Sequence, residues 1–317
     1  MLRYLWAMTK IQSLDGTPIS PLCYGAMQFG GTADADASRA MYDACRAAGL
    51  TFFDTAHVYT GGASETLLGQ FIAPERDRLV IATKAAYEGG AGRDNILSSV
   101  EDSRRRMDLE VIDILYMHRW DPVTPLEETF ETLAQLRHAG TIRYVAVSNY
   151  AAWQVMKAQA VAASFDLSIS MMQPMYSLVK RQAEVEILPM AQDQGIAVVP
   201  YSPLGGGLLT GKYARGGDGR LTTDSRYAAR YGQPWMHETA AALTEVAAEA
   251  GIDPATLAVA WAARHPAVAA PIISARSVAQ LAPSLGALSV TLDDALYKKV
   301  TALSPTPAPA TDRLEEG

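Results

Sequence analysis

Seven short apolar runs in the chain end in polar side chains that could do chemistry. Asp54 follows "TFF", Lys84 follows "IAT" and His118 follows "LYM". The other runs end at Ser148 and Asn149, Gln173, Tyr201 and Ser202, and Arg276. A carboxylate, an ammonium and an imidazole that meet at one place could polarise a carbonyl group and deliver a proton to it. The pattern therefore predicts a reactive centre, provided that the fold brings the run ends together.

Tyr59, five residues after Asp54, is the candidate general acid. An ammonium about 4 Å away stabilises a phenolate by about 4 kcal/mol at an effective dielectric of about 20. Lys84 could thus lower a phenol pKa near 10 by roughly three units, before desolvation opposes the shift. Asp54 would keep Lys84 charged, and His118 would donate a hydrogen bond to the substrate oxygen. This set is typical of carbonyl reduction, for which a cofactor must supply the hydride.

Each of these residues also has an ordinary explanation. Asp54 and Lys84 could form a structural ion pair, His118 could be a satisfied core residue, and Asn149 could cap the following helix. A separate structural explanation would be needed at each of the seven run ends, whereas one shared functional site accounts for all of them. The chain has no serine hydrolase elbow, no HExxH motif and no His/Cys cluster, so we expect no metal site.

The elements that must position these residues are apolar runs alternating with segments of helical period. The runs are "PLCYGAMQFG", "TFFDTA", "LVIATKAA", "DILYMHRW", "IRYVAVSN", "SISMMQPMY", "IAVVPYSP" and "VAAPIISAR". Nearly continuous apolar strands are typical of a parallel sheet covered on both faces. Eight strand–helix units predict an α/β fold, the (β/α)8 TIM barrel, whose chemistry lies at the carboxyl ends of its strands. A doubly wound sheet is the alternative, but no G-x-G-x-x-G follows the first strand.

The flanking segments predict one domain over residues 1–317. Asp15-Gly16 indicates an N-terminal β-hairpin, and "TLDDALYKKVTAL" indicates an extra C-terminal helix. The Pro-rich segment 305–317 predicts a flexible tail after an ordered core of about residues 9–304.

Composition narrows the class of protein. The 317 residues are 49% hydrophobic and 19% charged, with a net charge of −7, which argues against a nucleic-acid partner. Cys23 and Cys45 predict buried thiols in a reducing compartment. The first ten residues lack the pattern of a signal peptide, and Arg264, His265 and Pro266 interrupt the apolar stretch "LAVAWAARHPAVAAPII". We expect a cytoplasmic protein without a membrane segment.

The glycine-rich stretch "PLGGGLLTGKY" is close to a phosphate-binding P-loop. That motif needs Ser or Thr after its lysine to bind magnesium, and Tyr213 follows Lys212 here. Residues 205–235 lack a helical period and predict a loop that a ligand orders. The stretch could therefore cover phosphate groups without being a P-loop.

At these residues the sequence resembles an aldo-keto reductase of the bacterial type that acts on sugars and small aldehydes. The resemblance rests on "FFDTAHVYTGGASETLLG", "IATKAA", "YMHRWDP", "GTIRYVAVSNY", "MMQPMYSLV", "VVPYSPLGGGLLTGKY" and "PIISARSVAQL", and covers nearly the whole chain. It implies a (β/α)8 barrel that binds NADPH and reduces an aldehyde or ketone. It implies a catalytic tetrad of Asp54, Tyr59, Lys84 and His118. The implied cofactor contacts are Ser148, Asn149, Gln173, Tyr201, Ser202, Leu204, Gly206, Lys212, Arg276, Ser277 and Gln280.

Within the resemblance, Arg276 and Ser277 would bind a 2′-phosphate at a helix N-terminus, which favours NADPH over NADH. Ser274 and Ser284 stand where the family usually has glycine and asparagine. The implied substrate is a small carbonyl compound, and the candidate pocket residues are Tyr24, Met27, His57, Tyr87 and Trp120. A cofactor-holding regulatory protein, like the β-subunits of potassium channels that share this fold, is the alternative.

Overall fold

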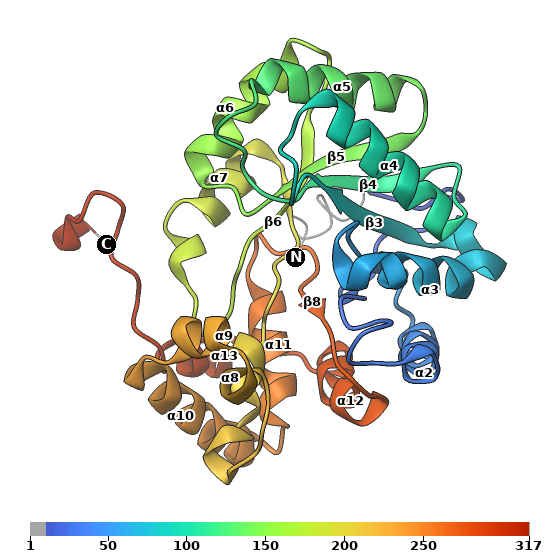
Figure 1. The fold of residues 1–317 in the computed structure, drawn as a ribbon. Helices are drawn as coiled ribbons and strands as arrows, with labels where there is room; N and C mark the ends of the chain where they lie inside the picture. Colours follow the sequence, from blue (N-terminus) through green and yellow to red (C-terminus); the bar gives the residue numbers. More distant parts are fainter. Residues whose placement is uncertain (1–10, 317) are drawn as a thin grey trace.

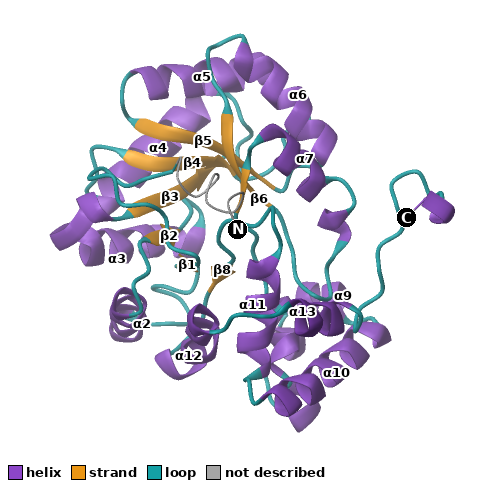
Figure 2. Ribbon diagram, turned by 180° about the vertical axis from the view of Figure 1, so that it is seen from behind, coloured by secondary structure: helices purple, strands orange, loops and turns teal. Residues whose placement is uncertain are grey.

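Eight parallel strands form the centre of the computed structural model, which describes residues 11–316 (Figures 1 and 2). The strands are β1 (Cys23–Gly25), β2 (Phe52–Asp54), β3 (Val80–Ala85), β4 (Ile112–Met117), β5 (Ile142–Ser148), β6 (Ile169–Gln173), β7 (Ala197–Val198) and β8 (Ile272–Ile273). Their order in the sheet is β7-β6-β5-β4-β3-β2-β1-β8. The predicted α/β class with eight parallel strands is confirmed.

The two edges of this sheet approach each other, so the sheet curls on itself. Isolated parallel bridges join Val198 to Val268 and Tyr201 to Ile272. The Ile272 N–H also donates to the Pro200 carbonyl at 2.8 Å. The curl gathers the carboxyl ends of the strands into one ring.

Most helices follow the strands and cover the outside of the sheet. The helices are α2 (Ala35–Ala47), α3 (Ala63–Ile72), α4 (Arg93–Met107), α5 (Leu126–His138), α6 (Ala152–Ala163), α7 (Ile187–Gln194), α8 (Arg220–Thr223), α9 (Ser225–Tyr231), α10 (Pro234–Ala250), α11 (Pro254–Arg264), α12 (Val278–Gly286) and α13 (Asp294–Thr301). The short helices α8 and α9 instead carry residues that line a cleft. Side chains such as Asp34 and Asp253 cap helix N-termini. None of the helices within residues 11–316 is long and apolar enough to cross a membrane.

Alternate residues of each strand face two different cores. Cys23, Phe52, Val80, Ala82 and their counterparts on the other strands form a core inside the curled sheet. Their immediate neighbours pack outward against the helices. Because side chains alternate along a strand, Asp54 and Lys84 continue the inward rows of Phe52 and Ala82. The alternation of side chains along each strand therefore points these polar residues toward the inside of the curled sheet.

The two ends of the described chain contain an isolated β-bridge and a short 3-10 turn. Gln12 and Pro18 form an isolated antiparallel bridge around the Asp15-Gly16 turn, where Gly16 has φ +90°. The residues after α13 extend away from the body (Figure 1) and end in a short 3-10 turn at Leu314–Glu316. Residues 1–10, on which the signal-peptide prediction rests, lie outside the described residues. Cys23 and Cys45 are buried free thiols.

Residues 205–235 contain short helices, where the sequence predicted a loop. A 3-10 segment spans Gly205–Thr210, and α8 and α9 follow after a short link. Asp224 caps α9 by accepting from the Arg226 N–H at 2.9 Å. Gly206, at φ +67°, packs so closely that an added Cβ would lie 2.8 Å from the Tyr227 ring. Local capping and aromatic packing therefore order a segment too short to show a helical period.

Four non-glycine residues near the carboxyl ends of strands have left-handed backbones. Ala86, Asn149 and Ser202 have φ of 63°, 58° and 60° and lie just beyond β3, β5 and β7. Thr60, in the connection from β2 to α3, has φ 48°. The chain thus turns sharply at the ring of strand ends.

Candidate active site

A buried ion pair lies at the centre of the strand ends. The Lys84 ammonium donates to Asp54 Oδ1 and, at 2.7 Å, to the Thr55 carbonyl. Gln173 Nε2 donates to Asp54 Oδ2 at 3.0 Å. Burial raises the pKa of Asp54 despite the opposing charge of Lys84. For Lys84, burial acts to lower the pKa, but Asp54 and Tyr59 raise it above its usual value. The Lys84 side chain is therefore a charged ammonium, held by Asp54 below the ring of strand ends.

Tyr59 lies directly over this ammonium. Lys84 Nζ is 4.9 Å from the centroid of the Tyr59 ring. Burial raises the pKa of Tyr59 and outweighs the lowering by Lys84, so the lowered value expected from the ammonium alone is not found. The phenol keeps its proton at neutral pH, as a proton donor must.

A second ion pair anchors the turn that carries Tyr59. Arg106 on α4 donates to the His57 carbonyl at 2.8 Å and to Glu65 Oε2 at 2.9 Å. Glu65 on α3 is fully buried and also accepts from the Thr83 hydroxyl at 2.6 Å. The residue two positions before Tyr59 is thus tied to two helices.

His118 lies beside Tyr59 as a neutral imidazole. The two rings meet edge to face, with centroids 5.8 Å apart. Burial, followed by the charges of Lys84 and Arg119, lowers the pKa of His118 to about 3. Its Nδ1 is buried and has no hydrogen-bond partner within residues 11–316. The imidazole is therefore available to a ligand without carrying charge.

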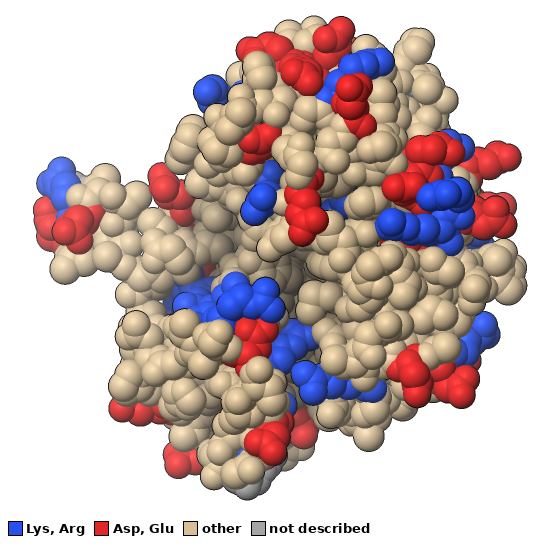
Figure 3. All heavy atoms as spheres, viewed as in Figure 1, with Lys and Arg blue, Asp and Glu red and all other residues tan. Residues whose placement is uncertain are grey.

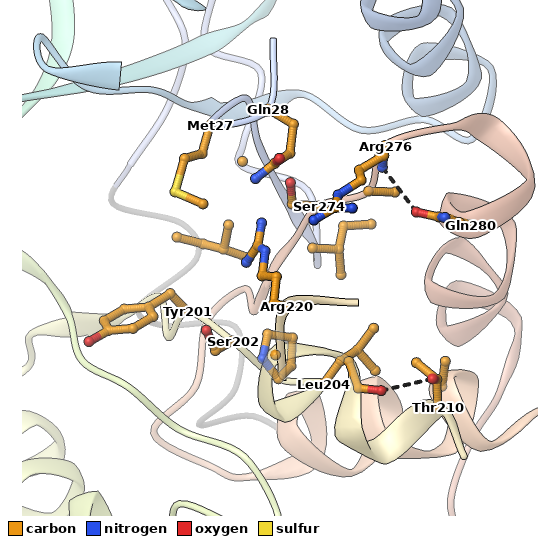
Figure 4. Close-up of a pocket in the computed structure, with 18 of the residues that line it drawn as sticks. Met27, Gln28, Tyr201, Ser202, Leu204, Thr210, Arg220, Ser274, Arg276 and Gln280 are labelled. Carbon is orange, nitrogen blue, oxygen red and sulfur yellow. Dashed lines mark hydrogen bonds between the residues drawn. The ribbon is translucent and has the colours of Figure 1, made fainter. Parts of the chain in front are cut away.

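A cleft of about 490 Å³ is lined by Asp54, Tyr59 and His118 and extends to Gln280 and Pro283 of α12. Its volume suits a small-molecule or cofactor site. Figure 4 shows part of its lining, with Arg220 projecting into the space between Met27 and Tyr201. The residues proposed for cofactor contact that line it are Ser148, Asn149, Gln173, Tyr201, Ser202, Leu204, Gly206, Lys212, Arg276 and Gln280.

The Asn149 side chain connects three residues at the floor of the cleft, namely His118, Ser148 and Tyr201. Its Nδ2 donates to the His118 carbonyl at 2.9 Å and to Ser148 Oγ at 3.1 Å. Its Oδ1 accepts from the Tyr201 hydroxyl at 2.8 Å. Asn149 does not cap the next helix, whose N-cap residue is Ala151. The floor is therefore a connected polar network.

The far end of the cleft is positively charged. Lys212 and Arg276 line it, and Gln280 Oε1 accepts from the Arg276 N–H at 3.3 Å. Burial, with the charges of Arg276 and Arg220, lowers the pKa of Lys212. Ser277 caps α12 and is not among the residues that line the cleft, so its cofactor contact stays a prediction. Cations at a helix N-terminus fit a phosphate-bearing ligand. The long cleft with this charged end fits a dinucleotide phosphate.

Of the five candidate substrate residues, Met27 alone lines the cleft. Tyr24 is fully buried, and its hydroxyl donates to Met41 Sδ at 3.4 Å on the helix side of the sheet. The expectation for Tyr24 is corrected, because its neighbours Cys23 and Gly25 occupy the inward positions of β1 and Tyr24 must point outward.

The remaining candidates lie around the rim. Tyr87 packs against His118 with ring centroids 4.7 Å apart. His57 faces Asp102 at 3.5 Å, and Trp120 packs edge to face on Trp153 at 5.6 Å. His57 and Trp120 are not among the residues that line this cleft, and their contact with substrate stays a prediction.

Sequence reasoning missed several lining residues. Gln28 follows β1, and Arg220 and Tyr227 come from α8 and α9. The strand-end rule could have found Gln28, since it lies toward the end of the first apolar run, three residues after β1. No such signal marks Arg220 or Tyr227, because their helices lie outside the strand–helix alternation.

The chain is similar to several known proteins. The profile of the Aldo/keto reductase family matches residues 21–305. The probable voltage-gated potassium channel subunit beta of Oryza sativa subsp. japonica is 34% identical over 272 residues, covering 80% of this chain and 82% of that protein. The uncharacterized oxidoreductase YrpG of Bacillus subtilis is 32% identical over 316 residues, which cover 93% of this chain and 95% of that protein. The aflatoxin B1 aldehyde reductase member 2 of Rattus norvegicus is 35% identical over 209 residues, which cover 64% of this chain and 57% of that protein.

Proposed function

The chain belongs to the aldo/keto reductase family, and from this premise we propose that it reduces an aldehyde or ketone to an alcohol with NADPH. One observation carries the proposal: a protonated Tyr59 lies over the buried, charged Lys84 at the head of a cleft that ends in cations. A proton donor and a site for a phosphate-bearing hydride carrier are the two requirements of carbonyl reduction.

The tetrad would divide the work of proton transfer. The substrate oxygen lies between the Tyr59 hydroxyl and the His118 imidazole and accepts a hydrogen bond from each. As negative charge develops on that oxygen, Tyr59 gives it a proton and becomes a phenolate, which the Lys84 ammonium stabilises. Asp54 keeps the ammonium charged and oriented. NADPH, when bound, would supply the hydride, and the phenolate would recover its proton from solvent.

The cleft residues would position the cofactor. Ser148, Asn149 and Gln173 would hold the carboxamide of the nicotinamide, and Tyr201 would stack on its ring. Lys212 and Arg276 would neutralise phosphate charge. The loop residues Ser202, Leu204 and Gly206 would cover the pyrophosphate, Gln280 would lie near the adenine, and Arg276 would give the preference for NADPH.

The similarity to the rice protein supports a second candidate. That relative is named as a probable potassium channel β-subunit, so this chain could hold the cofactor as part of a regulatory protein. Such a protein would bind NADPH in the same cleft. The two candidates differ in whether aldehydes are turned over at a rate that depends on Tyr59.

Turnover and cofactor binding together test both candidates. NADPH absorbance is followed with a panel of aldehydes and ketones, and NADPH binding is titrated by fluorescence on the same preparations. We expect turnover by the wild type, loss of turnover in Tyr59→Phe, and similar NADPH binding by both. Binding without turnover would favour the regulatory candidate. Absence of NADPH binding would reject both.

A further inference from the structure

Three basic side chains that pack on aromatic rings near the cleft have no carboxylate partner among residues 11–316. Arg119 follows β4, Lys180 follows β6, and Arg230 lies near the end of α9. None of the three lines the cofactor cleft, which has its own cations at its far end. Figure 3 shows Lys and Arg side chains, with an acidic side chain among them, beside the central hollow and close to the position of α9 in Figure 1. These cations are therefore additional to those expected to face phosphate.

Lys180 and Arg230 share a platform of two tyrosines. Lys180 Nζ is 5.6 Å from the Tyr231 ring centroid, and Arg230 Cζ is 5.3 Å from that of Tyr227. The two ring centroids are 6.2 Å apart. Tyr227 lines the cleft, so the platform joins the two cations to the cleft wall.

The charge of Arg230 reaches the cleft floor. Burial raises the pKa of Tyr201 to about 12, while Arg230 acts to lower it. Tyr201 lines the cleft beside Asn149, which contacts the backbone of His118. Arg230 is thus within electrostatic range of the reactive end.

Arg119 lies near the reactive end, because it directly follows His118 in the chain. Its guanidinium carbon is 4.9 Å from the centroid of the Tyr87 ring, which itself packs on His118. Its charge also contributes to the low pKa of His118, after burial and Lys84. One aromatic ring therefore separates this cation from the imidazole.

Several other half-buried arginines within residues 11–316 are paired with carboxylates, whereas Arg220, which lines the cleft, donates to the Tyr227 hydroxyl at 3.1 Å instead. Arg46 binds Glu75 at 2.6 Å, Arg106 binds Glu65 at 2.9 Å, and Arg181 binds Glu184 at 2.8 Å. Lys180 and Arg230 are half-buried without such partners. Burial, with the charge of Arg230, lowers the pKa of Lys180. Removing a cation from water without a counter-charge is costly, which indicates that a ligand supplies the missing negative charge.

We propose that Arg119, Lys180 and Arg230 form an anion site for the substrate, which is a carbonyl compound carrying a carboxylate. This inference rests on the proposed reductase function and names its substrate class. The carboxylate would lie at the mouth between the tyrosine platform and Tyr87, and the carbonyl would reach inward to Tyr59.

Kinetics with paired aldehydes test the anion site. We compare kcat/KM for 4-carboxybenzaldehyde with that for its uncharged amide, 4-carbamoylbenzaldehyde. The wild type should prefer the carboxylate, and Lys180→Gln or Arg230→Gln should each reduce the ratio of the two values about tenfold, as expected for one charge-assisted hydrogen bond. The exposed Lys157 and Arg137, away from the mouth, provide matched controls whose Gln variants keep the wild-type ratio.

The outcome separates this inference from the proposed function. If both aldehydes are reduced but the wild type shows no preference, or if the ratio survives Lys180→Gln and Arg230→Gln, the anion site is rejected and the reductase proposal stands. If neither aldehyde is reduced, benzoate and benzamide are titrated calorimetrically into cofactor-free protein. Preferential benzoate binding that the double variant Lys180→Gln/Arg230→Gln loses would still support the anion site, and equal binding would reject it. Thermal unfolding checks that each variant is folded.

Discussion

The Arg106–Glu65 ion pair, which anchors the turn before Tyr59, should be worth far more than a surface pair of the same length. Arg39 and Asp43 provide the comparison, since both pairs have N–O distances of 2.9 Å. Glu65 is 0% exposed and Arg106 23% exposed, whereas Arg39 and Asp43 are 50% and 54% exposed. The two pairs therefore differ in burial and hardly in geometry.

The loss of folding stability expected when one partner is removed depends on how deeply each ion pair is buried. Removing one partner of a buried pair costs about 3–5 kcal/mol, because the remaining charge is left uncompensated. For Arg106→Met we expect about 3 kcal/mol, at the low end, since Thr83 still donates to Glu65. Removing one partner of an exposed pair costs about 0–1 kcal/mol, the range we expect for Arg39→Met. Because Arg106 also holds the His57 carbonyl, only Arg106→Met should lower turnover.

Urea unfolding followed by circular dichroism measures the two free energies, with steady-state turnover measured on the same preparations. The double variant Glu65→Gln/Arg106→Met should be more stable than Arg106→Met alone, because it no longer buries an unpaired charge. Equal losses of stability for Arg106→Met and Arg39→Met would refute the reasoning from burial.

Four other outcomes are expected. Tyr59→Phe should lower aldehyde turnover about 10² to 10⁴-fold, with NADPH affinity within a few-fold of wild type; wild-type turnover would exclude Tyr59 as the proton donor. Arg276→Ala should weaken NADPH binding by about 1.5–3 kcal/mol and NADH binding little, and equal losses in a titration would contradict the 2′-phosphate contact. Because the folded pKa of His118 is about 3 against 6.5 for a free imidazole, its contribution to stability should be lost as pH falls from about 6.5 toward 3; the stability of His118→Gln should fall less over that range, and an identical pH profile would contradict the neutral imidazole. Hydrogen exchange in residues 205–235 should slow when NADP is added, and unchanged exchange would indicate a preformed segment.

Strand period made the central part of the site predictable. Asp54, Lys84 and Gln173 each continue an inward row of apolar residues, so their meeting in the ring follows from alternation and parallel order. The same rule explains why Tyr24 does not reach the cleft: it lies within β1 between the inward residues Cys23 and Gly25 and therefore points outward.

Other parts depend on contacts that sequence pattern does not show. The helices α8 and α9 have four and seven residues, too few to show a helical period, yet they bring Arg220 and Tyr227 to the cleft. The high pKa of Tyr59 depends on how fully the phenol is buried, which the spacing to Asp54 and Lys84 could not indicate. The pairing of Arg106 with Glu65 joins two helices across 41 residues of sequence.

The left-handed residues Ala86, Asn149, Ser202 and Thr60 imply a trade-off between durability and activity at the strand ends. A non-glycine residue in this conformation costs about 1–2 kcal/mol, so glycine at Ala86 would relieve part of that cost. Glycine would also let the backbone there sample more conformations, which would loosen the ring that aligns the tetrad. Attempts to make the protein withstand higher temperature should therefore begin at the outer helices, since relief gained at the ring would come with a less well-aligned catalytic centre.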